Sequence, residues 1–277
     1  MRAFYLVVTR YIVRLRPLDR AALFVICTYL ALAFGTQSGA SVAGQGLDPV
    51  LAAARQRGTL RVAVDFGFLP FSGIVDNQPI GYDIELAREV ATRLGLQVEF
   101  VPSGLDSIYD DLAARRADMA ASALPYAPEQ GWRARFSSFY FNAGQVLVVP
   151  QGSPINQIDQ LDGRAVGVPL GSDADTYARR LLADGFSFKL IADRDTPAEV
   201  IAALRRAELD AVIIDHAAAL TELAAAPELQ IATALTLEPY VLAVAPDAFQ
   251  LHAEINRVLD TLRREGFFDE LGRRWFR

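Results

Sequence analysis

Histidine and cysteine, which serve as general bases, nucleophiles and zinc ligands, are scarce in this chain. It contains two histidines, His216 and His252, and a single cysteine, Cys27. No set of nucleophile, histidine and acid is visible, and the sequence has neither an H-E-x-x-H motif nor a Gly-rich phosphate loop before a helix. One cysteine excludes a Cys-rich zinc site, a disulfide framework and an iron–sulfur cluster. We therefore expect no metal, no cofactor and no catalytic residues.

The most informative polar residue is Asp215, which follows the apolar segment 211–214 (AVII). Such a segment is typical of a buried strand. An acid at the carboxyl end of a strand faces the usual ligand crevice of an open α/β sheet. Asp215 could instead cap the helix that follows, so a ligand contact and a helix N-cap are both open interpretations.

Length and charge limit the function classes. The chain has 277 residues, of which 52% are hydrophobic and 22% charged, with a net charge of −6. This is enough for one large domain or two small ones, each with its own core. Nearly all the positive charge is arginine, Lys189 being the only lysine, and no basic block occurs. An acidic chain of this kind is a poor nucleic-acid binder.

The first 43 residues differ from the rest. Five arginines and one acid precede or flank an apolar run at residues 21–34 (AALFVICTYLALAF). Fourteen residues suit the apolar region of a signal peptide better than a membrane span, and residues 41–43 (SVA) fit the small-residue cleavage pattern. We expect residues 1–43 to be a signal peptide or, if uncleaved, an anchor that provides the only membrane contact. We expect the remainder, which carries a net charge of −10, to be exported.

Strands alternate with helices along the rest of the chain. Strands are predicted where short apolar runs occur and helices where apolar residues recur at steps of three and four. Residues 196–199 (TPAE) form a capping box with proline at the first helical position, so a helix should start there. The alternation occurs twice over and predicts two α/β lobes. Strands are expected at 60–64, 97–101, 119–121, 145–149, 165–168, 188–191, 211–214 and 241–245, and helices at 82–94, 106–116, 173–182 and 247–265.

Six motifs in order resemble the extracytoplasmic solute-binding proteins of family 3, the amino-acid-type receptors of ABC importers. The G-[FY]-D-[VI]-[DE]-[LI]-[AC] signature is matched by residues 81–87 (GYDIELA). The remaining matches are residues 60–65 with 69–71, 136–149, 161–168 with 171–172, 266–269 and 275–276. Together they span residues 59–277.

The resemblance implies a two-lobed periplasmic-binding-protein-like fold of type II, with a central cleft and two hinge crossings. Residues 59–146 with 242–277 would form lobe 1 and residues 147–241 lobe 2, with crossings near Val148–Val149 and near Tyr240. The protein would capture a small polar solute, amino-acid-like or an amine, and deliver it to the permease subunits of an ABC importer. We expect a periplasmic or extracytoplasmic monomer. A periplasmic enzyme resembling cyclohexadienyl dehydratases, or an accessory protein without a transport role, remains the alternative on the same fold.

The family's ligand contacts carry over only in part. An arginine in lobe 1 normally binds the ligand's carboxylate, but Gln130 stands at its position, and Arg133 and Arg135 are three and five residues further on. Ser122 and Ser172 match the polar contacts of the two lobes, and Asp215 matches the aspartate that binds the ammonium group.

Three further residues are expected in or near the cleft by the same resemblance. Phe68 matches an aromatic wall or is a core phenylalanine, Asp65 matches the first acid, and Asp173 lies at a helix start, where it could be the N-cap. Because three acids would face one cleft with no aligned arginine, we expect the site to favour amines over acidic ligands.

Overall fold

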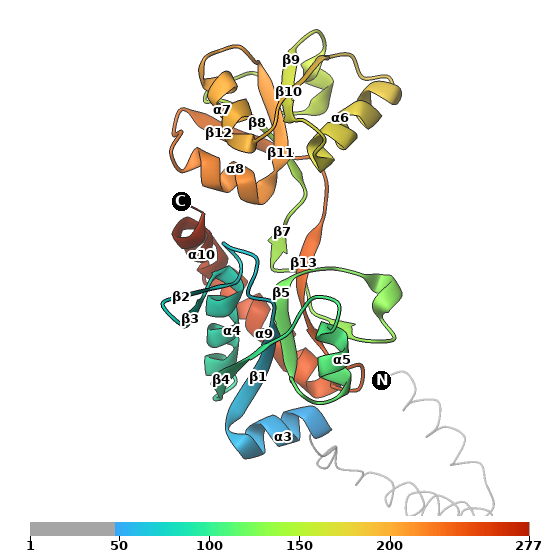
Figure 1. Cartoon of the computed structure of the whole chain (residues 1–277), viewed down its shortest axis with the longest axis vertical. Coiled ribbons are helices and arrows are strands. Elements are labelled where there is room, and N and C mark those ends of the chain that lie inside the picture. The colour runs from blue at the N-terminus through green and yellow to red at the C-terminus, as the bar shows by residue number, and fades with distance from the viewer. Residues whose placement is uncertain (1–47, 277) are drawn as a thin grey trace, which may run out of the picture. The chain divides into compact units, whose positions relative to one another are not determined.

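The structure is a computed structural model that describes residues 48–276, and the predicted signal segment lies outside the described residues. The described residues form a two-lobed α/β fold with one large sheet in each lobe (Figure 1). Within this part of the chain, no helix is both long and apolar enough to cross a membrane.

The sheet of the first lobe has the strand order β4-β1-β5-β13-β6, and the short strand β7 also pairs with β13. Strands β4 and β5 run parallel to β1, whereas β13 runs antiparallel to β5. Figure 1 shows β13 beside β5, although the two are far apart in the sequence. The bounds are β1 (Thr59–Val64), β4 (Gln97–Pro102), β5 (Met119–Pro125), β6 (Arg135–Phe136), β7 (Phe141–Asn142) and β13 (Pro239–Val244).

The sheet of the second lobe has the order β10-β9-β11-β8-β12. Strands β10, β9 and β11 are parallel, and β8 runs antiparallel to both β11 and β12. The bounds are β8 (Gln145–Pro150), β9 (Ala165–Pro169), β10 (Lys189–Arg194), β11 (Ala211–Asp215) and β12 (Leu229–Ala234). Along β8, residues alternate between the cores on the two faces of the sheet, Val146 and Val148 on one and Leu147 and Val149 on the other.

Helices surround each sheet, and a hairpin follows β1. The predicted helices over 82–94, 173–182 and 247–265 are confirmed with small shifts at their ends, while the one over 106–116 is shorter. The first lobe contains β2 (Gly73–Val75), β3 (Gln78–Ile80), α3 (Pro49–Arg57), α4 (Tyr82–Arg93), α5 (Ile108–Ala113), η1 (Pro128–Gln130), α9 (Phe249–Arg264) and α10 (Phe267–Trp275). The second contains η2 (Ile158–Leu161), α6 (Asp173–Ala183), α7 (Pro197–Arg205) and α8 (His216–Leu223).

The chain passes from one sheet to the other at residues 143–144, between β7 and β8, and again at 235–238, between β12 and β13. Two crossings are what the two-lobed fold requires. The lobe boundaries expected from the sequence, 59–146 with 242–277 and 147–241, stay a prediction.

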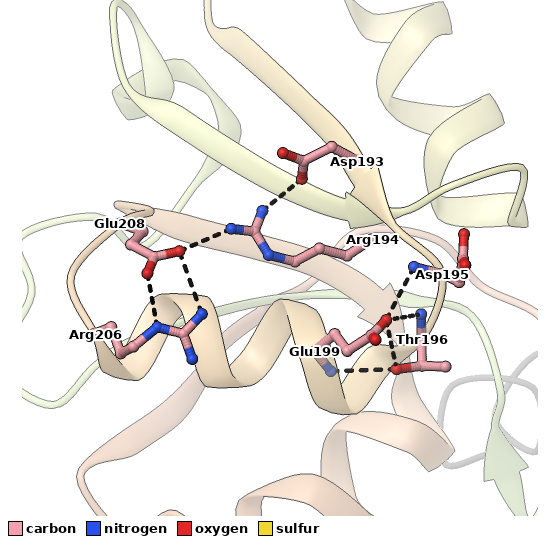
Figure 2. A network of polar contacts seen from close by, with 7 residues as sticks. All are labelled: Asp193, Arg194, Asp195, Thr196, Glu199, Arg206 and Glu208. Atoms are coloured by element: carbon pink, nitrogen blue, oxygen red, sulfur yellow. Dashed lines mark hydrogen bonds and ion pairs between the residues drawn. The ribbon is translucent and has the colours of Figure 1, made fainter.

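The predicted capping box at the start of α7 is confirmed. Thr196 accepts a hydrogen bond from the backbone N–H of Glu199, and the Glu199 carboxylate accepts from the N–H groups of Asp195 and Thr196 (Figure 2). These bonds satisfy backbone N–H groups at the helix start that would otherwise have no hydrogen-bond partner. They also hold the turn between β10 and α7, which contains Asp195.

The GYDIELA motif has a structural explanation at its first three residues. Gly81 has φ +135°, and a Cβ atom there would lie 2.1 Å from the carbonyl oxygen of Phe71. The N–H of Asp83 donates to that same oxygen at 2.9 Å, and its carboxylate Oδ2 accepts the N–H of Ala123 on β5. Only glycine fits such a close approach. The motif therefore starts α4 and ties it to the sheet.

Asp83 is completely buried, and its carboxylate lies beside the buried hydroxyl of Tyr140. Burial raises the pKa of the Asp83 carboxyl to about 7, against the lowering effect of the N–H donated by Ala123. The native state therefore holds a proton that the unfolded chain releases near the ordinary pKa of 3.8.

Because the native state holds this proton, we expect the free energy of unfolding to depend on pH. Because the native state binds the extra proton between about pH 4 and 7, the contribution of Asp83 to the free energy of unfolding falls as the pH rises through that window and is constant above it. Between pH 5 and pH 8 the expected fall is about 2–3 kcal/mol. Urea unfolding of the wild type and of Asp83→Asn measures it, since the asparagine cannot titrate. The difference in free energy of unfolding between the two proteins should change with pH. For the exposed control Asp162→Asn, the difference from the wild type should be the same at every pH. A difference between Asp83→Asn and the wild type that does not vary with pH would contradict the proposed proton on Asp83.

Candidate ligand-binding site

A cavity of about 590 Å³ is lined by residues from both lobes. The first lobe contributes Phe68, Phe71 and Tyr240, and the second contributes residues that follow the carboxyl ends of its parallel strands. Four of the seven predicted ligand residues line this cavity: Phe68, Ser172, Asp173 and Asp215. A second cavity of about 570 Å³, lined by residues of α8 and α10, contains none of them.

Asp215 caps a helix, as one of the two interpretations held, and it also lines the cavity, while its contact with a ligand stays a prediction. Its Oδ1 accepts the N–H of Ala218 at 2.8 Å and so caps α8. The same side chain lines the cavity, and Asp215 lies opposite Gln145 in the antiparallel register of β11 and β8. One carboxylate oxygen is thus used by the helix, and the described residues provide no partner for Oδ2.

At the start of α6 the N-cap is Ser172, so the interpretation of Asp173 as N-cap is wrong. The Ser172 Oγ accepts the N–H of Asp175 at 3.2 Å and donates to the carbonyl of Pro169 at 2.7 Å. Asp173 is the first residue of the helix and is exposed, with its side chain free to face the cavity that it lines.

Phe68 is not a core phenylalanine. It is 49% exposed, and its ring stacks on that of Phe71, with 5.5 Å between the ring centroids and 13° between the planes. Phe71 is buried and packs edge-on against Phe141 and Tyr240. The buried rings hold Phe68 as an aromatic surface on the cavity.

The other three predicted residues are not among those that line the cavity. Ser122 is buried, and its Oγ accepts the N–H of Asp65 at 2.9 Å. The Asp65 carboxylate accepts the N–H of Gly67 at 3.1 Å. Gln130 ends η1, in the middle of the loop between β5 and β6. The role of these three in ligand binding stays a prediction.

No arginine, lysine or histidine lines the cavity within residues 48–276. Arg133 pairs with Asp110 at 2.8 Å and lies over the ring of Tyr109. Arg135 lies 4.3 Å from the ring centroid of Phe249 and donates to the carbonyl of Pro246. Neither of the arginines near Gln130 therefore replaces the carboxylate-binding arginine in this cavity.

Sequence reasoning missed several polar residues of the cavity, namely Gln145, Asp195, Glu238 and Tyr240. Gln145 is 4% exposed, and its Oε1 has no hydrogen-bond partner among the described residues. Asp195 could have been found, because it directly precedes the capping box and follows a predicted strand. Gln145 was expected only as the first residue of a strand, and nothing in the sequence marks Glu238.

The electrostatic environment of the cavity is negative. Burial, together with the carboxylates of Asp83, Asp215 and Glu238, which disfavour the phenolate, raises the pKa of the Tyr240 hydroxyl to about 12. With four carboxylates lining the cavity and no basic side chain, the arrangement can bind a cation and would repel an anion.

Known proteins share this organisation. The sequence pattern of the bacterial extracellular solute-binding proteins, family 3, matches residues 60–277. The lysine/arginine/ornithine-binding periplasmic protein of Escherichia coli (strain K12) is 27% identical over 230 residues, which cover 79% of this chain and 87% of the relative.

Solved structures share the fold. The L-cystine solute receptor of Neisseria gonorrhoeae in its unliganded open conformation has a TM-score of 0.70 and 25% identity, covering 82% of this chain and 96% of that one. An ancestral cyclohexadienyl dehydratase has a TM-score of 0.71 and 24% identity, covering 84% of this chain and 98% of that one, a likeness of fold alone. The match to the family pattern covers most of the chain, and the chain belongs to the bacterial extracellular solute-binding proteins of family 3.

Proposed function

We propose that this protein captures a small, positively charged solute in the 590 Å³ cavity and delivers it to an ABC importer. The observation that carries the proposal is a cavity lined from both lobes by four carboxylates and three aromatic rings, those of Phe68, Phe71 and Tyr240, with no basic side chain among its lining residues. Asp215 would bind an ammonium group through Oδ2, and Phe68 would cover the ligand's apolar part or its cation. The similarity to a periplasmic protein that binds lysine, arginine and ornithine supports a cationic solute.

Transport requires a partner and a location. The permease subunits of an importer are the proposed partner, with the binding protein acting as a monomer outside the cytoplasmic membrane. The segment 21–34 would be removed with the signal peptide or retained as an anchor. The periplasmic relatives support an extracytoplasmic location.

Binding rather than catalysis is the proposed activity. A dehydratase needs a positioned general acid and groups that hold its substrate's carboxylates, and the lining residues provide no cation for them. A dehydratase-like enzyme would instead convert a prephenate-like substrate, which a turnover assay of the exported protein detects.

A thermal-shift screen tests the ligand class. A ligand that binds only the folded form raises the melting temperature, by RT ln(1 + [L]/Kd) in free energy. We expect amines and basic amino acids to raise it, and glutamate and aspartate to have no effect, because like charges in a desolvated cavity repel. A shift that is largest for an acidic ligand would contradict the proposed class. Ligand recovered unchanged after incubation supports binding without turnover.

The charge of Asp215 can be separated from its capping role. Asp215→Asn keeps an oxygen that accepts the N–H of Ala218 but removes the negative charge. We expect a loss of about 2 kcal/mol or more in binding, roughly 30-fold in Kd, with an unchanged melting temperature of the free protein. Calorimetric titration with the best ligand of the screen measures the affinity. The exposed Asp184→Asn on the same lobe is the matched control. Equal affinities of the two variants for the ligand would show that the charge of Asp215 does not contribute to binding.

A ligand that touches both lobes should also favour their closed arrangement. Phe68 and Tyr240 belong to the first lobe and Asp173 and Asp215 to the second, so one ligand makes all these contacts only when the lobes approach each other. The expected result is a smaller radius of gyration in small-angle scattering at saturating ligand. An unchanged radius would indicate a site confined to one lobe or a cleft closed in advance, and the delivery mechanism would lose its basis.

A further inference from the structure

The cavity combines negative charge with one buried acceptor that no protein donor reaches. Gln145, at the first position of β8, lines the cavity and is more than nine-tenths buried. Its backbone N–H donates to Thr236 Oγ1 at 2.7 Å, but its side-chain Oε1 has no partner among the described residues. A buried acceptor without a donor is costly, and an N–H group of a ligand in the cavity would satisfy this oxygen.

Gln145 and Asp215 are neighbours across the pair of strands β8 and β11. The two residues are partners in the register of β11 and β8, which places their backbones side by side. The Oε1 of Gln145 and the Oδ2 of Asp215 both lack protein donors within the described part of the chain. A primary ammonium group offers three N–H donors and no acceptor, which matches two adjacent acceptors.

The remaining carboxylates of the cavity would repel an anion. Asp173, Asp195 and Glu238 line the same cavity. The nearby Arg194 is held by Asp193 and Glu208, and in Figure 2 the carboxylate of Asp195 points away from this network. The cavity's negative charge is therefore not neutralised by that arginine.

Helix starts are the other place where a ligand carboxylate could bind, and several of their donors are already used. At α6, Ser172 accepts the N–H of Asp175, and the Asp175 carboxylate accepts the N–H of Gly171 at 3.1 Å. At α8, Asp215 accepts the N–H of Ala218. The free donors of α6 lie beside the Asp173 carboxylate, which would repel a second carboxylate.

We propose that the site is specific for amines that lack a carboxylate, such as the decarboxylated counterparts of basic amino acids, and that Gln145 binds their ammonium group together with Asp215. This inference rests on the proposed function and narrows its ligand class. An α-amino acid would bring a carboxylate into a cavity whose lining has four of its own and no cation. Removing that group from the ligand should therefore raise the affinity.

Matched pairs of ligands test this directly by calorimetric titration of the exported protein. The pairs are arginine and agmatine, lysine and cadaverine, and ornithine and putrescine, whose members differ only in the carboxylate. We expect the amine to bind at least tenfold more tightly in the best-binding pair. Equal or tighter binding of the amino acid overturns the amine specificity but leaves a cationic-solute receptor in place. No binding by any of the six ligands overturns the proposed function together with this inference.

A second variant series tests the residue. Gln145→Met has a similar shape and removes the acceptor, so the affinity for the amine should fall at least tenfold. Gln145→Glu keeps an acceptor and adds charge, so it should bind the amine at least as well as the wild type. The exposed Gln97→Met is the matched control, and urea unfolding verifies that each variant folds. An amine affinity unchanged in a folded Gln145→Met protein would overturn the role of Gln145.

Discussion

Parallel strands end at the same edge of a sheet, and the candidate site depends on that constraint. In the second lobe β10, β9 and β11 are neighbours and run in one direction. Three residues at or just beyond their carboxyl ends, Asp195, Ser172 and Asp215, are separated in sequence but line one cavity. Each is held by the helix that begins there, through a capping box at α7 and through side-chain caps at α6 and α8. The same hydrogen bonds that start the helices thus fix the positions of the polar groups.

Capping and ligand binding compete for the same atoms, and this competition shapes the chemistry of the site. A helix start binds anions when its N–H groups are unsatisfied. Here serine and aspartate side chains satisfy several of them, and the aspartates add negative charge. The helix starts are therefore negatively charged and do not resemble an anion site, because the protein's own carboxylates lie where a ligand carboxylate would bind.

In the first lobe the cavity wall depends on buried aromatic packing and on a buried carboxylate. Phe71 is surrounded by Tyr82, Phe141, Tyr240 and Phe276, and the exposed ring of Phe68 stacks on it. The turn that carries Phe68 and Phe71 contacts Gly81, where α4 begins and Asp83 is tied to β5. A packed cluster of this kind has little freedom to rearrange, so the first lobe offers a rigid surface for the ligand.

Local sequence determined the elements whose signals lie within a few residues. The amphipathic pattern of α4 and α6, the capping box of α7 and the apolar runs of β1, β9 and β11 were predictable, and the family motifs determined the fold. The helix α3 was not predicted, because its start depends on Asp48, which accepts N–H groups from Leu51 and also from Gln250 and Leu251 at the start of α9. Such a shared cap is a long-range contact, and no local pattern reveals it.

For the site, the sequence by itself determined that Asp215 follows a strand and precedes a helix, and that no arginine stands at Gln130. Only the tertiary structure decided where Arg133 and Arg135 point, since their partners Asp110 and Phe249 come from other elements. It also placed Gln145 opposite Asp215 while leaving Asp65 and Ser122 outside the cavity lining. The physical reason is register: which residues face a cavity depends on how strands pair across long stretches of chain, and that pairing is set by the whole fold.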